Sequence, residues 1–97
     1  MITTLVRFKY GNDFDEARIR QVAQATRSRF EGMPGLRFKA FTVDTANREA
    51  LNVYVWDAEE SARAFFSPET IERVKGLYGV QPILLYSEVV EMVENAR

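Results

Sequence analysis

Residues 50–66 hold the most informative stretch of the chain, ALNVYVWDAEESARAFF. From Leu51 to Trp56, aliphatic side chains alternate with polar or aromatic ones, and this period of two predicts a β-strand over residues 50–56. Asp57 and Glu60 follow at the three-residue spacing of a capping box, which predicts a helix over residues 61–66. A strand that leads directly into a helix is the unit around which the rest of the chain is arranged.

Alternation of the same kind predicts three more strands, over residues 2–10, 36–43 and about 83–90. Apolar residues at three- and four-residue steps predict a first helix from Asp13 to about Phe30. Ser67 and Pro68 are expected to restart the second helix. The resulting βαββαβ order predicts an α+β fold: a ferredoxin-like sandwich with a four-stranded antiparallel sheet and two helices on one face.

The two faces of this sheet are expected to differ. Leu51, Val53 and Val55 form a wholly aliphatic set, and we expect it to lie beneath the helices together with Val6 and Phe8. The other face would then display aromatic side chains: Trp56, Tyr54, Phe41 and Tyr86. So large an apolar face does not stay in water on a monomer, so we expect a homodimer that packs sheet to sheet.

The composition excludes several chemistries. The chain has 97 residues, which corresponds to one domain over residues 1–97, and it contains neither Cys nor His. Ser-His-Asp triads, Cys nucleophiles, zinc sites with Cys or His ligands and His- or Cys-ligated haem are therefore excluded. Because the sequence also shows no Gly-rich phosphate loop, we predict a protein without metal, flavin or other cofactor.

Charge and hydropathy restrict the partners. A net charge of −1 argues against nucleic acid as a partner. No apolar run approaches the roughly 20 residues that span a bilayer, so no membrane partner is expected. The N-terminal stretch lacks the pattern of a signal peptide, and the expected location is the cytoplasm.

Several short pieces of sequence carry a resemblance to a known superfamily. They include EGMPGL at residues 31–36, the stretch KAFT at residues 39–42 and VYVWDAEESA at residues 53–62. With these pieces in this order, the chain resembles the dimeric α+β-barrel superfamily, which includes the antibiotic-biosynthesis monooxygenases. Within that superfamily it is most similar to the YdhR-like group, and the resemblance covers nearly the whole chain.

The resemblance implies a homodimer in which each protomer holds a small aromatic-lined pocket. Quinone-forming monooxygenases of this superfamily use neither metal nor flavin. Their substrate is an acidic phenol or anthrone, which loses a proton so that the electron-rich anion can reduce O₂ directly. An Asn and a Trp four residues apart on the third strand take part in those enzymes, and Asn52 and Trp56 match that spacing.

Six residues are the candidates for such a site. We predict catalytic roles for Arg7, Asn52 and Trp56, with Arg7 as the cation that stabilises an enolate. Each also has a plainer interpretation: an ion pair of Arg7 with Glu88, an interface hydrogen bond for Asn52, and a dimer-core position for Trp56. The residues expected to bind substrate are Phe41, Tyr54 and Tyr86.

Different classes of function remain open at this point. The first is a cofactor-independent monooxygenase acting on a small aromatic or polyphenolic substrate, with lactone isomerisation as a further enzymatic variant. The second is a non-catalytic homodimer that binds a small apolar or aromatic molecule. An RNA-binding sheet is disfavoured because residues 50–56 lack the basic, glycine and aromatic pattern of RNA-recognition motifs.

Overall fold

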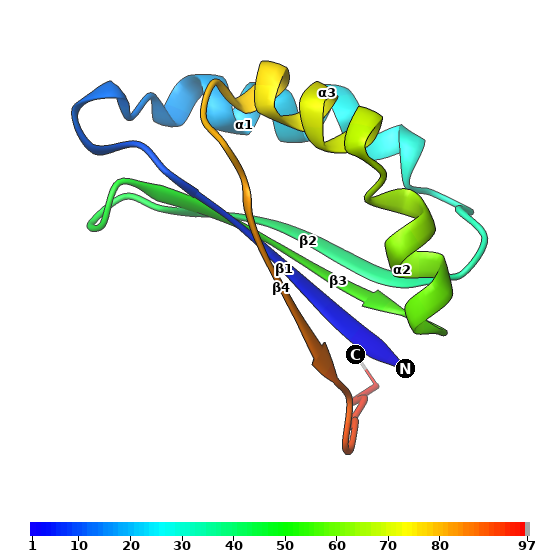
Figure 1. Ribbon diagram of the computed structural model, residues 1–97. Coiled ribbons are helices and arrows are strands. Elements are labelled where there is room, and N and C mark those ends of the chain that lie inside the picture. The colour runs from blue at the N-terminus through cyan, green and yellow to red at the C-terminus, as the bar shows by residue number, and fades with distance from the viewer. Residues whose placement is uncertain (97) are drawn as a thin grey trace.

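The helices of the computed structural model, which describes residues 1–96, all lie on one side of a single sheet (Figure 1). The strands are β1 (Ile2–Lys9), β2 (Leu36–Asp44), β3 (Glu49–Trp56) and β4 (Ile83–Glu88). The helices are α1 (Glu16–Thr26), α2 (Glu59–Phe65) and α3 (Pro68–Tyr78), and short 3-10 helices, η1 (Gly11–Asp13) and η2 (Arg27–Arg29), flank α1. The sheet order is β2-β3-β1-β4 with antiparallel neighbours, which confirms the predicted α+β, ferredoxin-like sandwich.

Local capping explains where two of the helices begin. The Ser67 side chain accepts a hydrogen bond from the backbone N–H of Thr70, and Pro68 occupies the first turn of α3, as predicted. Helix α1 is capped by Asp15, which accepts from the backbone N–H of Arg18, rather than by Asp13. The residue that begins this helix therefore lies two positions later than the sequence suggested.

The predicted capping box at Asp57 is wrong. The Asp57 carboxylate lies 3.5 Å from the guanidinium of Arg37, and its backbone N–H donates to the Gly35 carbonyl. These contacts hold Asp57 against the turn before β2, so α2 begins after Ala58, which has no side-chain acceptor to offer. The helix nevertheless forms, because tertiary packing of its apolar face stabilises it.

Strand register determines which side chains lie beneath the helices. In the β1–β3 pair, Val6 is opposite Asn52 and Phe8 is opposite Ala50. Directly opposite residues of an antiparallel pair share a face, so the even-numbered residues of both strands face the helices. The buried core consists of these residues and the helix side chains above them: Ile2, Val6, Phe8, Ile19, Ala50, Tyr54, Trp56, Ala62, Phe66 and Tyr78.

The expected face of β3 is therefore wrong, although that of β1 is confirmed. Leu51, Val53 and Val55 lie on the open face, where they are half-buried. The four aromatic residues expected on the open face instead face the helices: Phe41, Tyr54, Trp56 and Tyr86. A layer of side chains separates the helices from the sheet, and large aromatic rings fill this layer. The rings of Tyr54 and Trp56 contact those of Phe65, in α2, and Phe66, at the C-terminus of α2.

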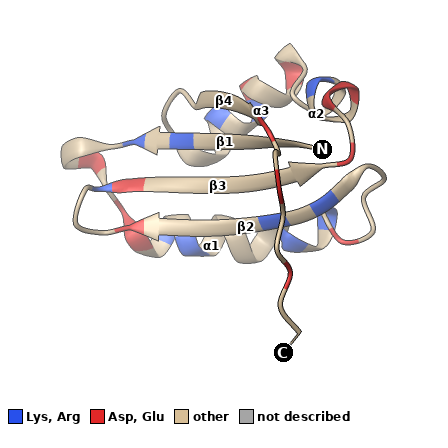
Figure 2. Cartoon of the chain, turned by 90° about the horizontal axis from the view of Figure 1, so that it is seen from below, with Lys and Arg blue, Asp and Glu red and all other residues tan. Residues whose placement is uncertain are grey.

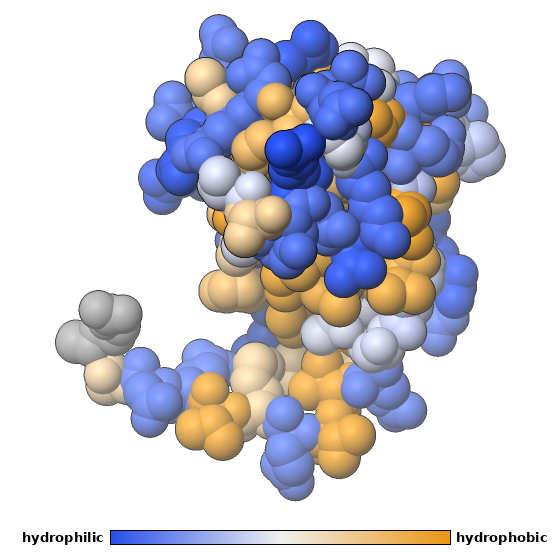
Figure 3. All heavy atoms as spheres, turned by 90° about the vertical axis from the view of Figure 1, so that its left-hand side faces the viewer, coloured by the Kyte–Doolittle hydropathy of each residue, from blue (hydrophilic) through white to orange (hydrophobic). Residues whose placement is uncertain are grey.

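Figure 2 views the sheet from its open side and shows that most positions of the four strands are uncharged. The exposed side chains of the open face include Phe38 and Leu85, each 53% exposed, and Ile83. Residues 89–96 run without regular structure across this face, and Figure 3 shows them projecting from the body of the molecule. A space of about 470 Å³ separates this tail from the sheet near Phe38 and Val55. Among the described residues, no helix has both the length and the apolar character needed to cross a bilayer.

Candidate functional site

A small cavity of about 110 Å³ lies between the sheet and the helices. Strands β2 and β3 form its floor, while α1, the segment after α1, α2 and α3 form its walls. Three lining side chains are cationic, and none of the lining residues within the described chain is acidic. The lining residues are Thr26, Arg29, Phe30, Met33, Lys39, Phe41, Asn52, Tyr54, Phe65, Arg73, Val74, Leu77 and Tyr78.

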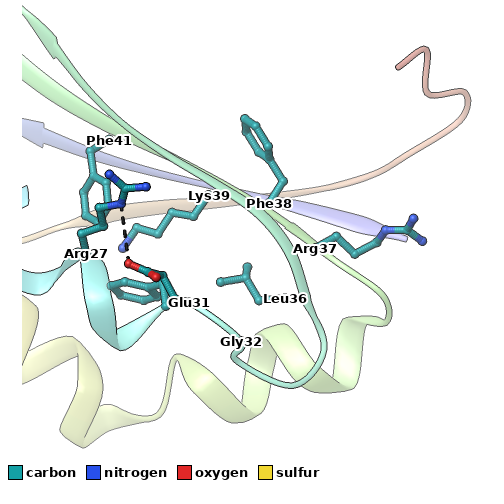
Figure 4. Close-up of a pocket in the computed structure, with 9 residues that line it drawn as sticks. Arg27, Glu31, Gly32, Leu36, Arg37, Phe38, Lys39 and Phe41 are labelled. Atoms are coloured by element: carbon teal, nitrogen blue, oxygen red, sulfur yellow. Dashed lines mark ion pairs between the residues drawn. The ribbon is translucent and has the colours of Figure 1, made fainter. Parts of the chain in front are cut away.

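A larger, more open cleft of about 530 Å³ adjoins this cavity. The cleft and the cavity share Phe30, Lys39 and Phe41, so these side chains form the boundary between them. In Figure 4 the Lys39 side chain extends toward Phe41 and toward the ion pair between Arg27 and Glu31, whose atoms lie 3.7 Å apart. The cleft thus provides a route from solvent to the Lys39 amine.

The Lys39 amine is held among aromatic rings. Its Nζ lies 3.3 Å from the ring centre of Phe30, 4.1 Å from that of Phe41 and 4.4 Å from that of Tyr54. Burial lowers the pKa of Lys39 to about 7, because the amine loses hydration that stabilises its charged form. The ring faces act in the opposite direction, since they attract an ammonium ion. Within residues 1–96, no carboxylate lies at ion-pairing distance from this amine.

Asn52 is joined to α3 by a buried hydrogen bond. Its Nδ2 donates to the hydroxyl of Tyr78 at 3.0 Å, and the residue is 3% exposed. The ring of Tyr78 stacks on Phe8 at 3.9 Å between centres, which fixes the hydroxyl above the sheet. Burial raises the pKa of Tyr78, although the hydrogen bond from Asn52 partly offsets that increase. Tyr78 therefore presents a neutral hydroxyl at the cavity wall near neutral pH.

Three of the six predicted site residues meet at the cavity. Phe41, Asn52 and Tyr54 line it: Phe41 of β2 is paired with Asn52 of β3, and Tyr54 is the next residue of β3 on the same face. Trp56 shares their face and stacks on Tyr54, but it does not line the cavity, and its Nε1 has no hydrogen-bond partner among the described residues. Tyr86 also faces the helices, where its ring lies beneath the guanidinium of Arg63.

The expectation that Arg7 shares a pocket with Asn52 is wrong. Arg7 pairs with Leu51 across β1 and β3, so it projects from the open face, on the opposite side of the sheet. Its guanidinium lies 3.4 Å from the carboxylate of Glu49 on β3, rather than near Glu88 on β4 as the plainer interpretation supposed. Arg7 is therefore separated from the cavity by the sheet itself.

Sequence reasoning missed the cations that line the cavity. Lys39 lies two residues before Phe41, so the sequence predicts that both side chains share one face of β2. The burial of Lys39 depends on the placement of the helices, which the sequence did not predict. Arg29 comes from η2 and Arg73 from α3, and no sequence spacing relates them. Tyr78 follows Val74 by four residues and could have been assigned to the buried face of α3.

The arrangement can bind and polarise a flat, acidic molecule. Aromatic side chains supply apolar walls, and the surrounding cations favour an anion. A lysine with a pKa of about 7 can accept a proton in its neutral form and can then stabilise the anion as an ammonium ion.

The sequence matches no protein-family model, and a search of curated proteins finds no match. Solved structures do match. SnoaB, a cofactor-independent oxygenase from Streptomyces nogalater, is 16% identical, with 97% of each chain covered and a TM-score of 0.69. The monooxygenase ActVA-Orf6 of Streptomyces coelicolor, solved with the ligand nanaomycin D, is 15% identical, with 98% of this chain and 92% of that chain covered and a TM-score of 0.69.

A dimeric ferredoxin-like protein of unknown function from Thermobifida fusca is 17% identical, with 91% of this chain and 90% of that chain covered and a TM-score of 0.68. At such identities the likeness shows a common fold. The chain has the ferredoxin-like α+β fold of the antibiotic-biosynthesis-monooxygenase structures, the fold of the superfamily that its sequence resembles.

Proposed function

We propose that the cavity binds a small planar aromatic or polyphenolic molecule and promotes its oxidation by O₂ without metal or flavin. The observation that carries this proposal is the cavity lining, which combines aromatic walls with Arg29, Lys39 and Arg73 and has no acidic side chain among the described residues. The description of SnoaB as a cofactor-independent oxygenase on the same fold supports the choice of reaction.

In the proposed reaction, the neutral Lys39 amine accepts a proton from the acidic substrate. The resulting ammonium ion stays beside the substrate anion and stabilises its charge. The electron-rich carbon of the anion then bonds to one atom of O₂. For an anthrone, the O–O bond then breaks, its CH₂ carbon becomes a carbonyl, and the second oxygen atom leaves as water with the two hydrogen atoms that this carbon has lost.

Oxygen consumption with anthrone and hydroquinone substrates tests this proposal, with and without a chelator. We expect turnover that survives the chelator and falls roughly 10²-fold in Lys39→Met, because a positioned proton acceptor typically contributes 10²–10⁴-fold. Lys75→Met removes an exposed lysine of α3 outside the cavity and should leave the rate unchanged. Equal rates for the wild type, Lys39→Met and buffer would refute catalysis.

A specific observation favours a non-catalytic binding protein as the second candidate. The Asn52 amide already donates to Tyr78, and Trp56 lies outside the cavity lining, so the two matched residues do not face one ligand together. Under this alternative, a planar phenolic ligand binds in the cavity with no oxygen consumption. Binding in a calorimetric titration under anaerobic conditions, together with no oxygen consumption in the aerobic assay, would identify this alternative.

The proposed assembly is a homodimer formed through the open sheet face. Phe38, Ile83 and Leu85 are exposed there, as are Val90, Met92 and Val93 of the C-terminal tail, and a space lies between the sheet and this tail. A second copy would bury this surface and occupy that space. The dimeric state described for the Thermobifida fusca protein of the same fold supports this arrangement.

A further inference from the structure

The Lys39 amine has an unusual environment for a lysine. Lysine ammonium groups generally extend into water or pair with a carboxylate, whereas this one lies over the rings of Phe30, Phe41 and Tyr54. No carboxylate among the described residues pairs with it, and it sits where the cavity and the open cleft meet. The amine is thus desolvated by its surroundings and still reachable by a small molecule.

Desolvation makes a lysine amine nucleophilic near neutral pH. Only the neutral amine carries the lone pair that attacks a carbonyl, and an ordinary lysine with a pKa of about 10.4 is almost wholly protonated there. The pKa of about 7 caused by burial would leave a substantial fraction of Lys39 neutral. This agrees with the geometry, in which apolar rings rather than carboxylates surround the amine.

We propose that Lys39 is a reactive amine that forms a reversible Schiff base with small aromatic aldehydes carrying an anionic group. The flat apolar walls of the cavity select an aromatic ring. Arg29 and Arg73, both exposed at the helix side of the cavity, select the anionic group. This covalent site needs only the neutral amine and the cavity, so it does not depend on the proposed oxidation.

The reaction needs no further reagent. Nζ bonds to the carbonyl carbon, and the two protons of the neutral amine, together with the carbonyl oxygen, leave as water when the C=N bond forms. No electrons are gained or lost, and hydrolysis returns the free amine and the aldehyde. The aromatic surroundings favour the imine, because they exclude the water that would hydrolyse it.

The chain offers a direct test, because it contains three lysines: Lys9, Lys39 and Lys75. The folded protein is treated near neutral pH with one equivalent of 4-carboxybenzaldehyde, and the imine is trapped with cyanoborohydride. Intact mass and peptide mapping then show which amine is modified. We expect Lys39 to be modified at least tenfold more than Lys9, Lys75 or the N-terminal amine, and we expect this preference to disappear in concentrated urea.

Variants separate the amine from the anion-binding groups. Lys39→Met should abolish the preferred adduct, whereas Lys75→Met should retain it. Arg73→Gln should slow trapping of 4-carboxybenzaldehyde severalfold more than it slows trapping of uncharged benzaldehyde, because only the former carries a carboxylate. The urea comparison uses wild-type protein, so it decides the matter even if Lys39→Met fails to fold.

Modification of Lys39 no faster than that of Lys9 and Lys75 in the folded protein would overturn the proposal. A preference for Lys39 that persists in urea would also overturn it, since the selectivity would then come from the local sequence rather than from the cavity. Oxygen consumption is measured separately, so a failure of the oxidation leaves this result intact, and the reverse is equally true.

Discussion

Lys39 shows how burial changes the behaviour of one side chain. Its folded pKa of about 7 lies below the value of about 10.4 expected in an unfolded chain. Between these two pH values the unfolded chain binds a proton that the folded protein does not, so the free energy of unfolding rises with pH. Below pH 7 both states are protonated, and this contribution to stability is absent.

We therefore predict that the wild-type protein becomes more stable between about pH 7 and pH 9, with a slope of at most about 1.4 kcal/mol per pH unit. Lys39→Met should remove this slope, while Lys75→Met should retain it. Urea unfolding followed by circular dichroism at several pH values measures the effect. The prediction applies only below pH 10. Because burial raises the pKa of Tyr10 to about 12, above pH 10 this hydroxyl ionises more readily in the unfolded chain, and the free energy of unfolding falls with pH. A slope in Lys39→Met equal to that of the wild type would contradict the assignment.

The hydrogen bond between Asn52 and Tyr78 is a second feature of the residue scale. Tyr78→Phe removes the acceptor but keeps the ring that stacks on Phe8, so the Asn52 amide is left buried without this partner. We predict a loss of about 1–3 kcal/mol in the free energy of unfolding. The double variant Asn52→Leu with Tyr78→Phe should lose less than the sum of the single losses.

Tyr86→Phe provides the matched control for this prediction. The ring of Tyr86 also faces the helices, but within the described residues its hydroxyl makes no side-chain hydrogen bond. Its loss should change the free energy of unfolding by less than about 0.5 kcal/mol. If both tyrosine variants lost equal stability, the bond to Asn52 would not be the cause.

At the scale of elements, two consecutive helices differ in how they begin. Helix α3 has a Ser67 cap, whereas α2 follows Ala58, which has no side-chain acceptor. We predict that Ala58→Ser stabilises the protein by about 0.5–1 kcal/mol and that Ser67→Ala destabilises it by about 1 kcal/mol. Thermal and urea unfolding measure both changes. A destabilising Ala58→Ser would mean that packing at this position, rather than capping, controls the start of α2.

The elements also show where sequence periodicity is sufficient. A period of two located all four strands, because alternation follows from the geometry of an extended backbone. Ser67 and Pro68 marked the start of α3, because both act within one turn of chain. The Asp57 prediction failed for a tertiary reason, since Arg37 and Gly35 engage a residue that the local pattern assigned to a cap.

The whole molecule has one covered sheet face and one open face, and two valines distinguish them. Val6 is 1% exposed beneath the helices, and Val53 lies half-buried on the open face. We predict that Val6→Asp unfolds the protein, because an unpaired buried carboxylate costs several kcal/mol. Val53→Asp should fold and remain monomeric, because it places charge in the proposed interface.

Circular dichroism and light scattering together test this pair. The wild type should scatter as a particle of about twice 11.2 kDa, and Val53→Asp as one of about 11.2 kDa with an unchanged spectrum. If Val6→Asp folded and Val53→Asp did not, the assignment of the covered and open faces would be reversed. A dimeric Val53→Asp would move the interface away from this part of the sheet.

Only part of the candidate site could be predicted from the sequence. Asn52, Tyr54 and Phe41 were correctly grouped on one face, because alternation and an antiparallel partner bring them together. Arg7 was grouped with them wrongly, because the face of β1 was assigned correctly whereas the face of β3 was not. The YdhR-like grouping within the superfamily stays a prediction, as do the roles of the six residues.

The sequence by itself determined the strands, the βαββαβ order and the side of β1 that faces the core, because these follow from local periodicity. It could not determine which side of β3 lies beneath the helices, since both sides are apolar and alternation cannot distinguish them. Only the tertiary structure decided that Trp56 and Tyr54 face inward and Val53 outward, because helices above the sheet leave a gap that aromatic rings fill. The environment of Lys39 was decided in the same way: desolvation depends on every element that surrounds a side chain, and Phe30 reaches Lys39 only when the chain after α1 folds back over β2.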